Sequence, residues 1–363
     1  MEHICELQSI LGKYFKWSKP RLNVFVNLLL GLFLVRTVNL SDLATVLYSK
    51  AKISSSYRRI QRFFNWLKLV ENCNDILMQI MISIFDLKNR KNILSLDRTD
   101  WKFGKKHINI LVLGINIKGV SIPIVWISLG RAGNSKTEER FSILKKVMNE
   151  IPIEAFVADR EFIGSKWFQF LIHSNISFYI RIKENTQILR KQGNYTVAVA
   201  DLFKNLKANK KKTLESKYML LGVEVYIAAS RNHKNELLIV ITNACASKAL
   251  KIYKKRWCIE TLFSHLKTKG FCFEETHMTD LEKIDTWMLI LTLAVIWTMK
   301  VSMTIQEKIS IGNHGRKRTS IFKRSFEVIR KCLVHVSGGF CEELMHYISF
   351  LRIRKSCLEP ILS

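Results

Sequence analysis

At Asn92 the chain changes from helical periodicity to short runs rich in apolar and β-branched residues. The first run is Ile93–Leu96, and Ile108–Ile117 and Ser121–Leu129 follow, separated by Lys118-Gly119, a dipeptide typical of a hairpin turn. We therefore predict a three-stranded meander, beyond which the periodicity alternates between helix and strand. These later elements are expected at Lys136–Met148 (helix), Ile153–Ala158 (strand) and Ser165–His173 (helix). Strands followed by alternating helices and strands indicate an α/β layer on a mixed sheet.

The remaining segments extend this division of the chain. Residues 1–90 have helical periodicity throughout, whereas residues 176–245 contain short β-rich runs that a lysine-rich loop, Lys204–Lys217, interrupts. These strands are expected at Phe178–Ile182, Tyr195–Val199, Tyr218–Leu221, Glu224–Ala228 and Leu237–Thr242. We expect five segments: a helical domain (1–90), the first part of an α/β domain (91–175), a β-rich insertion (176–245), the rest of the α/β domain (246–303) and a basic helical region (304–363).

The charge of the chain limits its partners. It has 58 Lys and Arg against 30 Asp and Glu, a formal charge of +28, which implies a polyanionic partner such as nucleic acid or an anionic membrane surface. The two apolar runs, Leu22–Val35 and Trp287–Met299, are shorter than the ~20 residues of a membrane-spanning helix. The start, Met1–Lys16, lacks the segments of an export signal. We therefore expect a cytoplasmic protein that binds nucleic acid and no membrane.

A basic helix is expected at the end of the helical domain. It begins at Ser54–Ser56, whose hydroxyl groups are suited to cap the first turn, and it continues to Lys68. Its polar side carries three arginines, Arg58, Arg59 and Arg62. Together with the preceding short helix at Leu40–Leu47, it resembles a helix-turn-helix that binds DNA. A solvated basic helix within a helical bundle accounts for the same pattern.

Two aspartates stand at the carboxyl ends of expected central strands. Asp97 follows Ile93–Leu96, and Asp159 follows Ala155–Ala158. In open α/β sheets this edge is where functional sites form. Taken alone, each aspartate also fits a turn or a helix cap, so the interpretation depends on a third partner.

The third partner is Glu260, in a segment predicted to be one helix from Ala246 to Lys269. At ~100° per residue, the polar residues Tyr253, Arg256, Glu260 and Lys267 fall within an arc of about 60°. The apolar side lies roughly a quarter-turn away and comprises Ile252, Ile259, Leu262, Phe263 and Leu266. The polar stripe therefore either lines a site or forms a solvated face with spaced opposite charges.

The spacing Tyr253-x2-Arg256-x3-Glu260-x6-Lys267 resembles the YREK signature of DDE transposases of insertion-sequence family four, whose catalytic domain is similar to ribonuclease H. Leu96–Thr99 resembles the first-acid motif of that family. The second-acid motif is similar to Val157–Glu161, and His314–Arg316 is similar to a stretch near the end of family members. The resemblance covers about residues 90–330.

This resemblance implies a catalytic, metal-binding triad of Asp97, Asp159 and Glu260. Three carboxylates suit two magnesium ions, with manganese as a substitute, because these ions prefer oxygen ligands. One ion would activate water or a 3′ hydroxyl and the other would stabilise the leaving oxygen. Arg256 and Lys267 would hold phosphates, and Tyr253 would donate a hydrogen bond to another phosphate oxygen.

The implied partners are the terminal inverted repeats of the element, target double-stranded DNA and a second copy of the chain in a homodimer. Some family members hold a flipped base on an aromatic residue of the insertion, often Trp, but no Trp lies between Trp167 and Trp257. Tyr218, Tyr226 or Phe178 would have to stack instead, and such residues also simply fill β cores.

Several alternatives share these observations. Glu161 is a rival second-strand ligand, and Asp100 is a rival to Asp97. At the level of function, a ribonuclease-H-like nuclease without strand transfer would use the same acids and differ only in its product. A non-catalytic DNA-binding derivative of a transposase is a third reading, and the complete triad argues against it. A basic protein of membrane surfaces lacks an apolar span or anchor.

Overall fold

The structure is a computed structural model of the 363-residue chain, and it describes residues 2–68, 70–190, 195–305, 319–336 and 338–353. The motif expected at His314–Arg316 lies outside these ranges. The chain divides into two compact units. Unit 1 comprises Met1–Lys88, Asp100–Asn109 and Leu262–Ser363, and unit 2 comprises Asn89–Thr99 and Ile110–Thr261.

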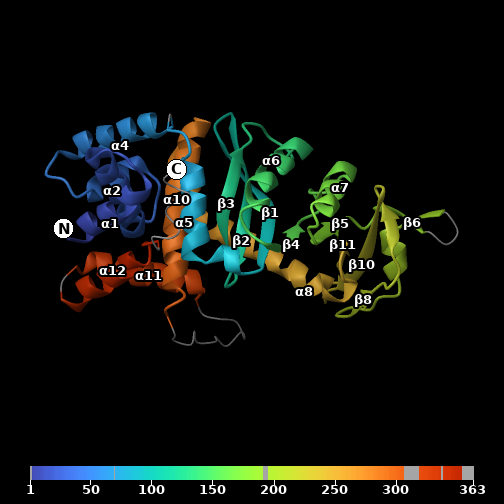
Figure 1. Ribbon diagram of the computed structural model, residues 1–363. Helices are drawn as coiled ribbons and strands as arrows, with labels where there is room; N and C mark the ends of the chain where they lie inside the picture. Colours follow the sequence, from blue (N-terminus) through green and yellow to red (C-terminus); the bar gives the residue numbers. More distant parts are fainter. Residues whose placement is uncertain (1, 69, 191–194, 306–318, 337, 354–363) are drawn as a thin grey trace. The chain divides into compact units, whose positions relative to one another are not determined.

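Unit 2 is built on a mixed sheet of eleven strands in the described residues (Figure 1). Its path is β3-β2-β1-β4-β5-β11-β10-β9-β6-β7, and β8 pairs with β10 beside this path. The strands are β1 (Asn92–Phe103), β2 (Lys106–Ile117), β3 (Val120–Ser128), β4 (Ile153–Ala158), β5 (Phe178–Ile182), β6 (Gln187–Arg190), β7 (Tyr195–Ala198), β8 (Lys211–Thr213), β9 (Tyr218–Leu220), β10 (Val223–Arg231) and β11 (Leu237–Thr242).

The first three strands form the expected antiparallel meander. Strands β2 and β3 are joined by Lys118 and Gly119, whose φ angles are 47° and 87°, as a tight hairpin turn requires. β1 then pairs in parallel with β4, and β4 with β5. The last four residues of β4 are buried, which fits a central strand covered on both faces. The mixed sheet with helices, predicted from the sequence as ribonuclease-H-like, is confirmed.

The β-rich segment after residue 176 is more closely joined to the sheet than the sequence indicates. β5 pairs with β4 in parallel, and β11 pairs with β5 in antiparallel register, so both strands continue the main sheet. Two strands were not expected, β6 and β8, and β8 lies inside the lysine-rich loop. Their short, polar sequences lack the apolar alternation that identifies a strand.

The helices of unit 2 correct one expectation. α6 (Thr137–Met148) and α7 (Ser165–His173) occur where the periodicity predicts them. The single helix expected from Ala246 to Lys269 is wrong. It is divided into η3 (Ala246–Lys248), α8 (Ala249–Tyr253), η4 (Lys254–Arg256) and α9 (Trp257–Leu266). The tighter η4 turn coincides with Arg256, a buried cation that turns inward to pair with carboxylates.

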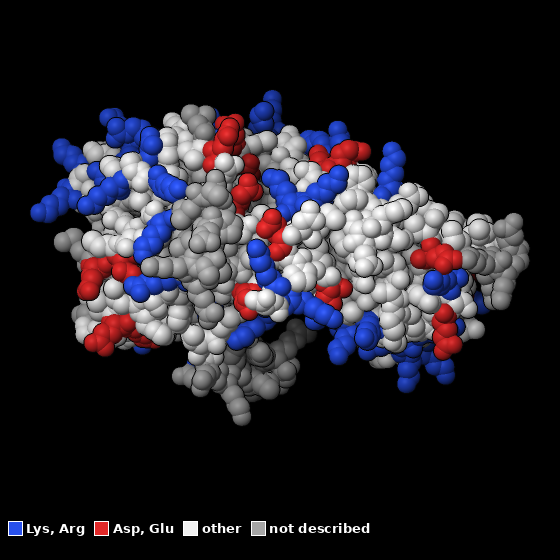
Figure 2. Space-filling view, in the orientation of Figure 1, with Lys and Arg blue, Asp and Glu red and all other residues white. Residues whose placement is uncertain are grey.

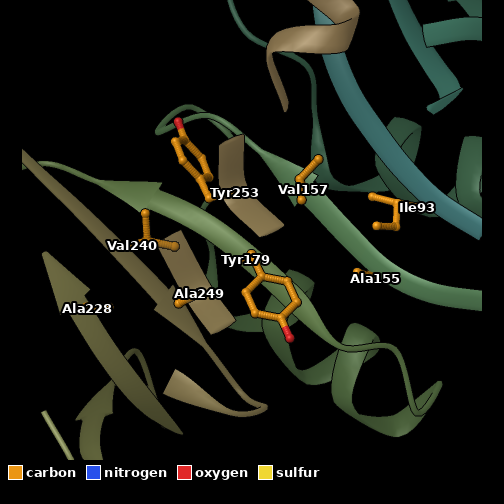
Figure 3. Close-up of a cluster of buried hydrophobic side chains, with 8 residues drawn as sticks. All are labelled: Ile93, Ala155, Val157, Tyr179, Ala228, Val240, Ala249 and Tyr253. Atoms are coloured by element: carbon orange, nitrogen blue, oxygen red, sulfur yellow. The ribbon is translucent and has the colours of Figure 1, made fainter. Parts of the chain in front are cut away.

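Helix α8 lies against the sheet, where it packs on β4, β5, β10 and β11. Tyr253, at its end, belongs to a buried cluster that Figure 3 shows together with Val157, Tyr179, Val240 and Ala249. Apolar packing therefore anchors the helix from which the site residues of the next turn project.

The described residues of unit 1 form helices, apart from the end of β1 and the start of β2. Its helices are α1 (Glu2–Tyr14), α2 (Lys19–Val35), α3 (Leu40–Val46), α4 (Ile53–Leu67), α5 (Cys73–Ile84), α10 (Leu281–Val301), α11 (Ile321–Val334) and α12 (Gly339–Ser349), with η5 (Phe273–Thr276). Short η1 (Leu87–Asn89) ends at the unit boundary, and η2 (Val199–Phe203) belongs to unit 2. α10 packs against α2, α4, α5 and α11, so the amino-terminal helices share a core with the carboxyl-terminal ones.

Among the described residues, α10 is long and apolar enough to cross a membrane by length and composition, and the bent pair of α1 and α2 is a second candidate. The sequence expectation that the run at Trp287–Met299 is too short is therefore wrong, because the helix has 21 residues and also includes its polar first turns. Of its most apolar window, 89% is buried inside the protein, as in the core helix of a helical bundle.

Candidate active site

The sheet brings three charged residues into one row. Parallel pairing between β1 and β4 joins Leu96 to Ala158, and pairing between β4 and β5 joins Ala158 to Ile180. The residues that directly follow Leu96, Ala158 and Ile180 are Asp97, Asp159 and Arg181, respectively. Asp97 lies within β1 and not beyond its end, since β1 continues to Phe103. The two aspartates therefore meet where the pairing of β1 with β4 ends, which is the edge that the sequence predicts.

The segment from Tyr253 to Glu260 converges on the same edge. The Nη1 atom of Arg256 lies 3.6 Å from Oδ2 of Asp97, and its Nη2 atom donates to Oε1 of Glu260. The hydroxyl of Tyr253 donates to Oδ1 of Asp159 over 3.4 Å. Of the residues proposed from the sequence, the structure thus links Asp97, Asp159, Tyr253, Arg256 and Glu260 within unit 2.

Burial controls the electrostatics of this cluster. Desolvation raises the pKa of Asp97 to about 7, although the amide of Arg98 and the charge of Arg256 oppose the shift; Glu161 and Asp159 add to it. Burial also raises the pKa of Tyr253 to about 12, so its hydroxyl keeps its proton and remains a donor. The charged form of a buried carboxylate is stabilised when a cation lies nearby, because the cation offsets the free-energy cost of desolvation.

Within the described residues, no group of three or more His, Cys, Asp or Glu side chains is arranged to hold a metal ion. The guanidinium of Arg256 pairs instead with both Asp97 and Glu260. The donor chemistry nevertheless fits a divalent ion, because carboxylate oxygens are the ligands that magnesium prefers and these two already share one cation. Two of the three predicted ligands, Asp97 and Glu260, are thus paired with Arg256 in this structure.

Lys267 belongs to unit 1 and has other partners. Its Nζ atom donates to the carbonyl oxygen of Asp100 over 2.9 Å and lies 2.7 Å from Oε1 of Glu274. It also lies 5.7 Å from the centre of the Trp101 ring. The 3₁₀ turn at η4 changes the helical phase of Tyr253 relative to the residues after Arg256, and Lys267 follows the end of α9.

Two cations near the acids were missed by the sequence analysis. Arg181 lies 3.9 Å from Oδ1 of Asp159, and Arg98 forms a forked ion pair with Glu161. Glu161, the rival ligand, is therefore already engaged. The available signal for Arg181 was a lone charge within the otherwise apolar strand β5.

The aromatic residues considered for base stacking are not equally accessible. Phe178 is buried against Phe168, with ring centres 5.2 Å apart, and Tyr218 is 8% exposed. Tyr226 is partly buried with the amino group of Lys217 near its ring. Phe178 and Tyr218 thus fill the β core.

The arginines of α4 are in unit 1. Arg58 and Arg62 are exposed and Arg59 is half-buried, whereas Ile60 and Phe64 are buried on the opposite side of the helix. The helix begins at Ile53, and no side chain caps it, so the expected serine cap is wrong. Figure 2 shows that Lys and Arg also outnumber Asp and Glu over the visible face.

Comparison with known families identifies the family of the domain. The model of the transposase DDE domain matches residues 88–297, more than half of the chain. The chain belongs to this family. The domain is therefore that of a DNA transposase, an enzyme class that cleaves and transfers DNA strands.

This transposase was also compared with individual proteins. No curated protein matches it significantly. Among solved structures, it is similar to the piggyBac transposase in a cryo-EM structure of the synaptic complex with hairpin DNA, at 11% identity and a TM-score of 0.48. The similarity covers 98% of this chain and 84% of the piggyBac chain.

Proposed function

We propose that this transposase is encoded by an insertion sequence similar to family four and that it cuts and joins the ends of its element. The observation that carries the proposal is the linkage of Asp97, Asp159 and Glu260 through Arg256 and Tyr253. A DDE domain has three catalytic acids, and the YREK signature includes the residues around the third acid. The contacts of Arg256 and Tyr253 with these acids at one edge of the sheet support the assignment of the triad and of the signature.

In this proposal Asp97, Asp159 and Glu260 hold two magnesium ions, or manganese in their place. When bound, the ions would activate the attacking hydroxyl and stabilise the leaving oxygen of an in-line displacement. The buried carboxylate of Asp97 favours a cation beside it. Tyr253 keeps its proton and orients Asp159 by donating to it.

Arg256 has a planar fork that now pairs two carboxylates and that matches a phosphate equally well. We assign it to a phosphate of the DNA strand that reacts. Arg181 adds a second positive charge at Asp159. Lys267 remains a proposed phosphate ligand, and it would exchange its contact with Glu274 for the DNA.

Recognition of the terminal inverted repeats is assigned to the helical domain, residues 1–90. The exposed Arg58 and Arg62, with Arg59 beside them, would contact the element ends. The remaining proposed segments are the divided catalytic domain (91–175 and 246–303), the insertion (176–245) and the basic carboxyl-terminal region (304–363). We expect a homodimer on DNA, because two ends have to be joined to one target.

The experiment combines the full-length protein, DNA carrying the element ends, target DNA and magnesium, followed by sizing of the products. Joined products support a transposase, whereas cut ends without joining support the nuclease alternative. Binding without cutting would support a non-catalytic derivative. Asp97→Asn and Glu260→Gln proteins serve as matched controls, since each changes one carboxylate to an isosteric amide.

A further inference from the structure

Arg98 and Glu161 form an ion pair between the two strands that carry the aspartates. Arg98 directly follows Asp97 on β1, and Glu161 lies two residues beyond Asp159, after the end of β4. Nε of Arg98 donates to Oε1 of Glu161 over 2.6 Å, and Nη2 donates to Oε2 over 2.7 Å. Both carboxylate oxygens are thus occupied by a fork whose planarity fixes its direction.

The ion pair of Arg98 and Glu161 is partly buried, so water screens it less than it would screen a pair on the surface. The side chain of Arg98 is 14% exposed and that of Glu161 is 21% exposed. Arg98 also donates to the carbonyl oxygen of Gly133 over 2.8 Å and to Oδ1 of Asn134 over 3.1 Å. One side chain therefore ties the strand of Asp97 to the turn after Asp159 and to the loop before α6.

A second arginine holds the same turn from another helix. Arg140 of α6 is 5% exposed, and its Nη2 atom donates to the carbonyl oxygen of Glu161 over 3.1 Å. The turn closes locally as well, because the amide of Phe162 donates to the carbonyl oxygen of Asp159. The chain after Asp159 is therefore fixed from three directions.

We propose that Arg98 and Glu161 are positioning residues that set the separation of the Asp97 and Asp159 carboxylates, and that Glu161 is not itself a metal ligand. The inference rests on the proposed two-metal function. Its basis is the pair of hydrogen bonds from Arg98 to Glu161. Both carboxylate oxygens of Glu161 accept from the guanidinium, so they are less available to bind a metal ion. Partners that orient metal ligands affect ion affinity strongly although they never touch the ion.

The two roles of Glu161 make different predictions for a double-mutant cycle. If the pair acts as a unit, Arg98→Gln and Glu161→Gln should weaken ion binding to a similar degree, and the double variant should be no worse than either single variant. If Glu161 is an independent ligand, Glu161→Gln should weaken binding far more than Arg98→Gln. The reversed pair, Arg98→Glu with Glu161→Arg, tests whether opposite charges alone recover part of the affinity.

The test measures binding of Mn²⁺ to the full-length protein by isothermal titration calorimetry, beside the Mg²⁺ concentration that half-saturates cleavage of end DNA. We expect both single variants to bind Mn²⁺ about 10- to 100-fold more weakly. The matched control is Lys217 with Glu224, an ion pair of 3.2 Å whose residues lie on neither β1 nor the turn after Asp159. Neutralising that pair should leave Mn²⁺ affinity unchanged.

Thermal unfolding of each variant separates positioning from a general loss of fold. If Arg98→Gln unfolds, Arg98→Lys keeps the charge without the fork and should still weaken ion binding. Wild-type Mn²⁺ affinity in the Arg98 variants, with a loss in Glu161→Gln, would overturn the inference and restore Glu161 as a ligand. A wild-type protein that neither binds Mn²⁺ nor cleaves end DNA would overturn the proposed function and this inference together.

Discussion

The guanidinium of Arg256 lies 3.6 Å from the carboxylate of Asp97. The same side chain donates to Glu260, so one cation joins an acid of the sheet to an acid of the following helix. Because Asp97 and Glu260 are far apart in sequence, this shared contact supports the proposal that Glu260 is the third acid.

Replacing Arg256 by alanine should reduce strand cleavage by roughly 10²- to 10³-fold, because a charge-assisted phosphate contact in the reacting complex is lost. Arg256→Lys should recover only a small part of the rate, since an ammonium lacks the fork. Single-turnover cleavage and thermal unfolding are measured on the same samples. Lys251→Ala, a change at an exposed position of α8, is the control. Cleavage at the wild-type rate by Arg256→Ala would show that Arg256 makes no contact that the reaction needs.

The stability of unit 1 should depend on pH through His265. This side chain is 3% exposed, and its ring stacks on Phe322 with ring centres 4.1 Å apart. Neither ring nitrogen has a hydrogen-bond partner among the residues that the structure describes. Burial, with a smaller contribution from Lys269, lowers the pKa of His265 from 6.5 to about 4. The unfolded chain therefore binds the proton more readily, so the stabilisation is complete above pH 6.5 and declines as pH falls from 6.5 toward 4.

The full loss in the free energy of unfolding corresponds to about 3 kcal/mol, since each unit of difference between the folded and unfolded pKa of His265 is worth ~1.4 kcal/mol. Urea unfolding at pH 7.5 and pH 5 should show part of this loss in the wild type and a smaller loss in His265→Phe, which keeps the stacking ring without a titrating group. Equal pH dependence in the two proteins would show that His265 does not contribute.

The exposed face of α4 should read DNA sequence. Arg58, Gln61, Arg62 and Asn65 follow the spacing of one helix face and are all exposed. Gln and Asn form paired hydrogen bonds with adenine, and Arg does so with guanine, each worth ~1–3 kcal/mol of discrimination. Gln61→Ala and Asn65→Ala should each relax preference at one base pair in competition binding assays.

Arg59→Ala is the matched comparison, because this half-buried residue lies beside that face. It should lower the salt dependence of binding without changing base preference, as expected for a phosphate contact. Unchanged end preference in the Gln61 and Asn65 variants would place sequence recognition elsewhere. Point variants are preferable to deletion of residues 1–88, because α2, α4 and α5 pack against α10.

Neutralising Lys210, Lys211 and Lys212 should flatten the salt dependence of DNA binding. All three side chains are exposed, and Lys211 and Lys212 belong to β8. Each lost phosphate contact should reduce the slope of log K against log salt by ~0.9. Filter binding at several salt concentrations measures the slope, and Lys146→Gln on α6 provides an exposed control. A slope equal to that of the wild type would identify the three lysines as solvated.

The elements that position the site were predictable where apolar periodicity decides them. The hairpin at Lys118 and the strand before Asp159 follow from local sequence, because buried strands require continuous apolar runs and tight turns require positive φ. The length of β1 was not predictable. Its second half is polar and lacks the apolar alternation that identifies a strand, although it lies next to β2 in the sheet.

The polar stripe expected on one helix from Tyr253 to Lys267 was only partly predictable. A regular helix was assumed from Tyr253 to Lys267, but the 3₁₀ turn at Lys254–Arg256 alters the phase. Arg256 still contacts both Asp97 and Glu260, whereas Lys267 pairs with Glu274. Neither the turn nor the pairing with Glu274 has a local pattern, because both depend on contacts formed only in the folded chain.

The central claim is that Asp97, Asp159 and Glu260 act as one metal site, and cleavage by Asp159→Asn protein tests it most directly. The amide keeps the size of the side chain and removes the charge that an ion requires. With Mg²⁺ and DNA carrying the element ends, the account predicts no detectable cleavage, while a gel shift shows end binding close to that of the wild type, because affinity comes from many backbone contacts. Cleavage by Asp159→Asn at the wild-type rate would contradict the account.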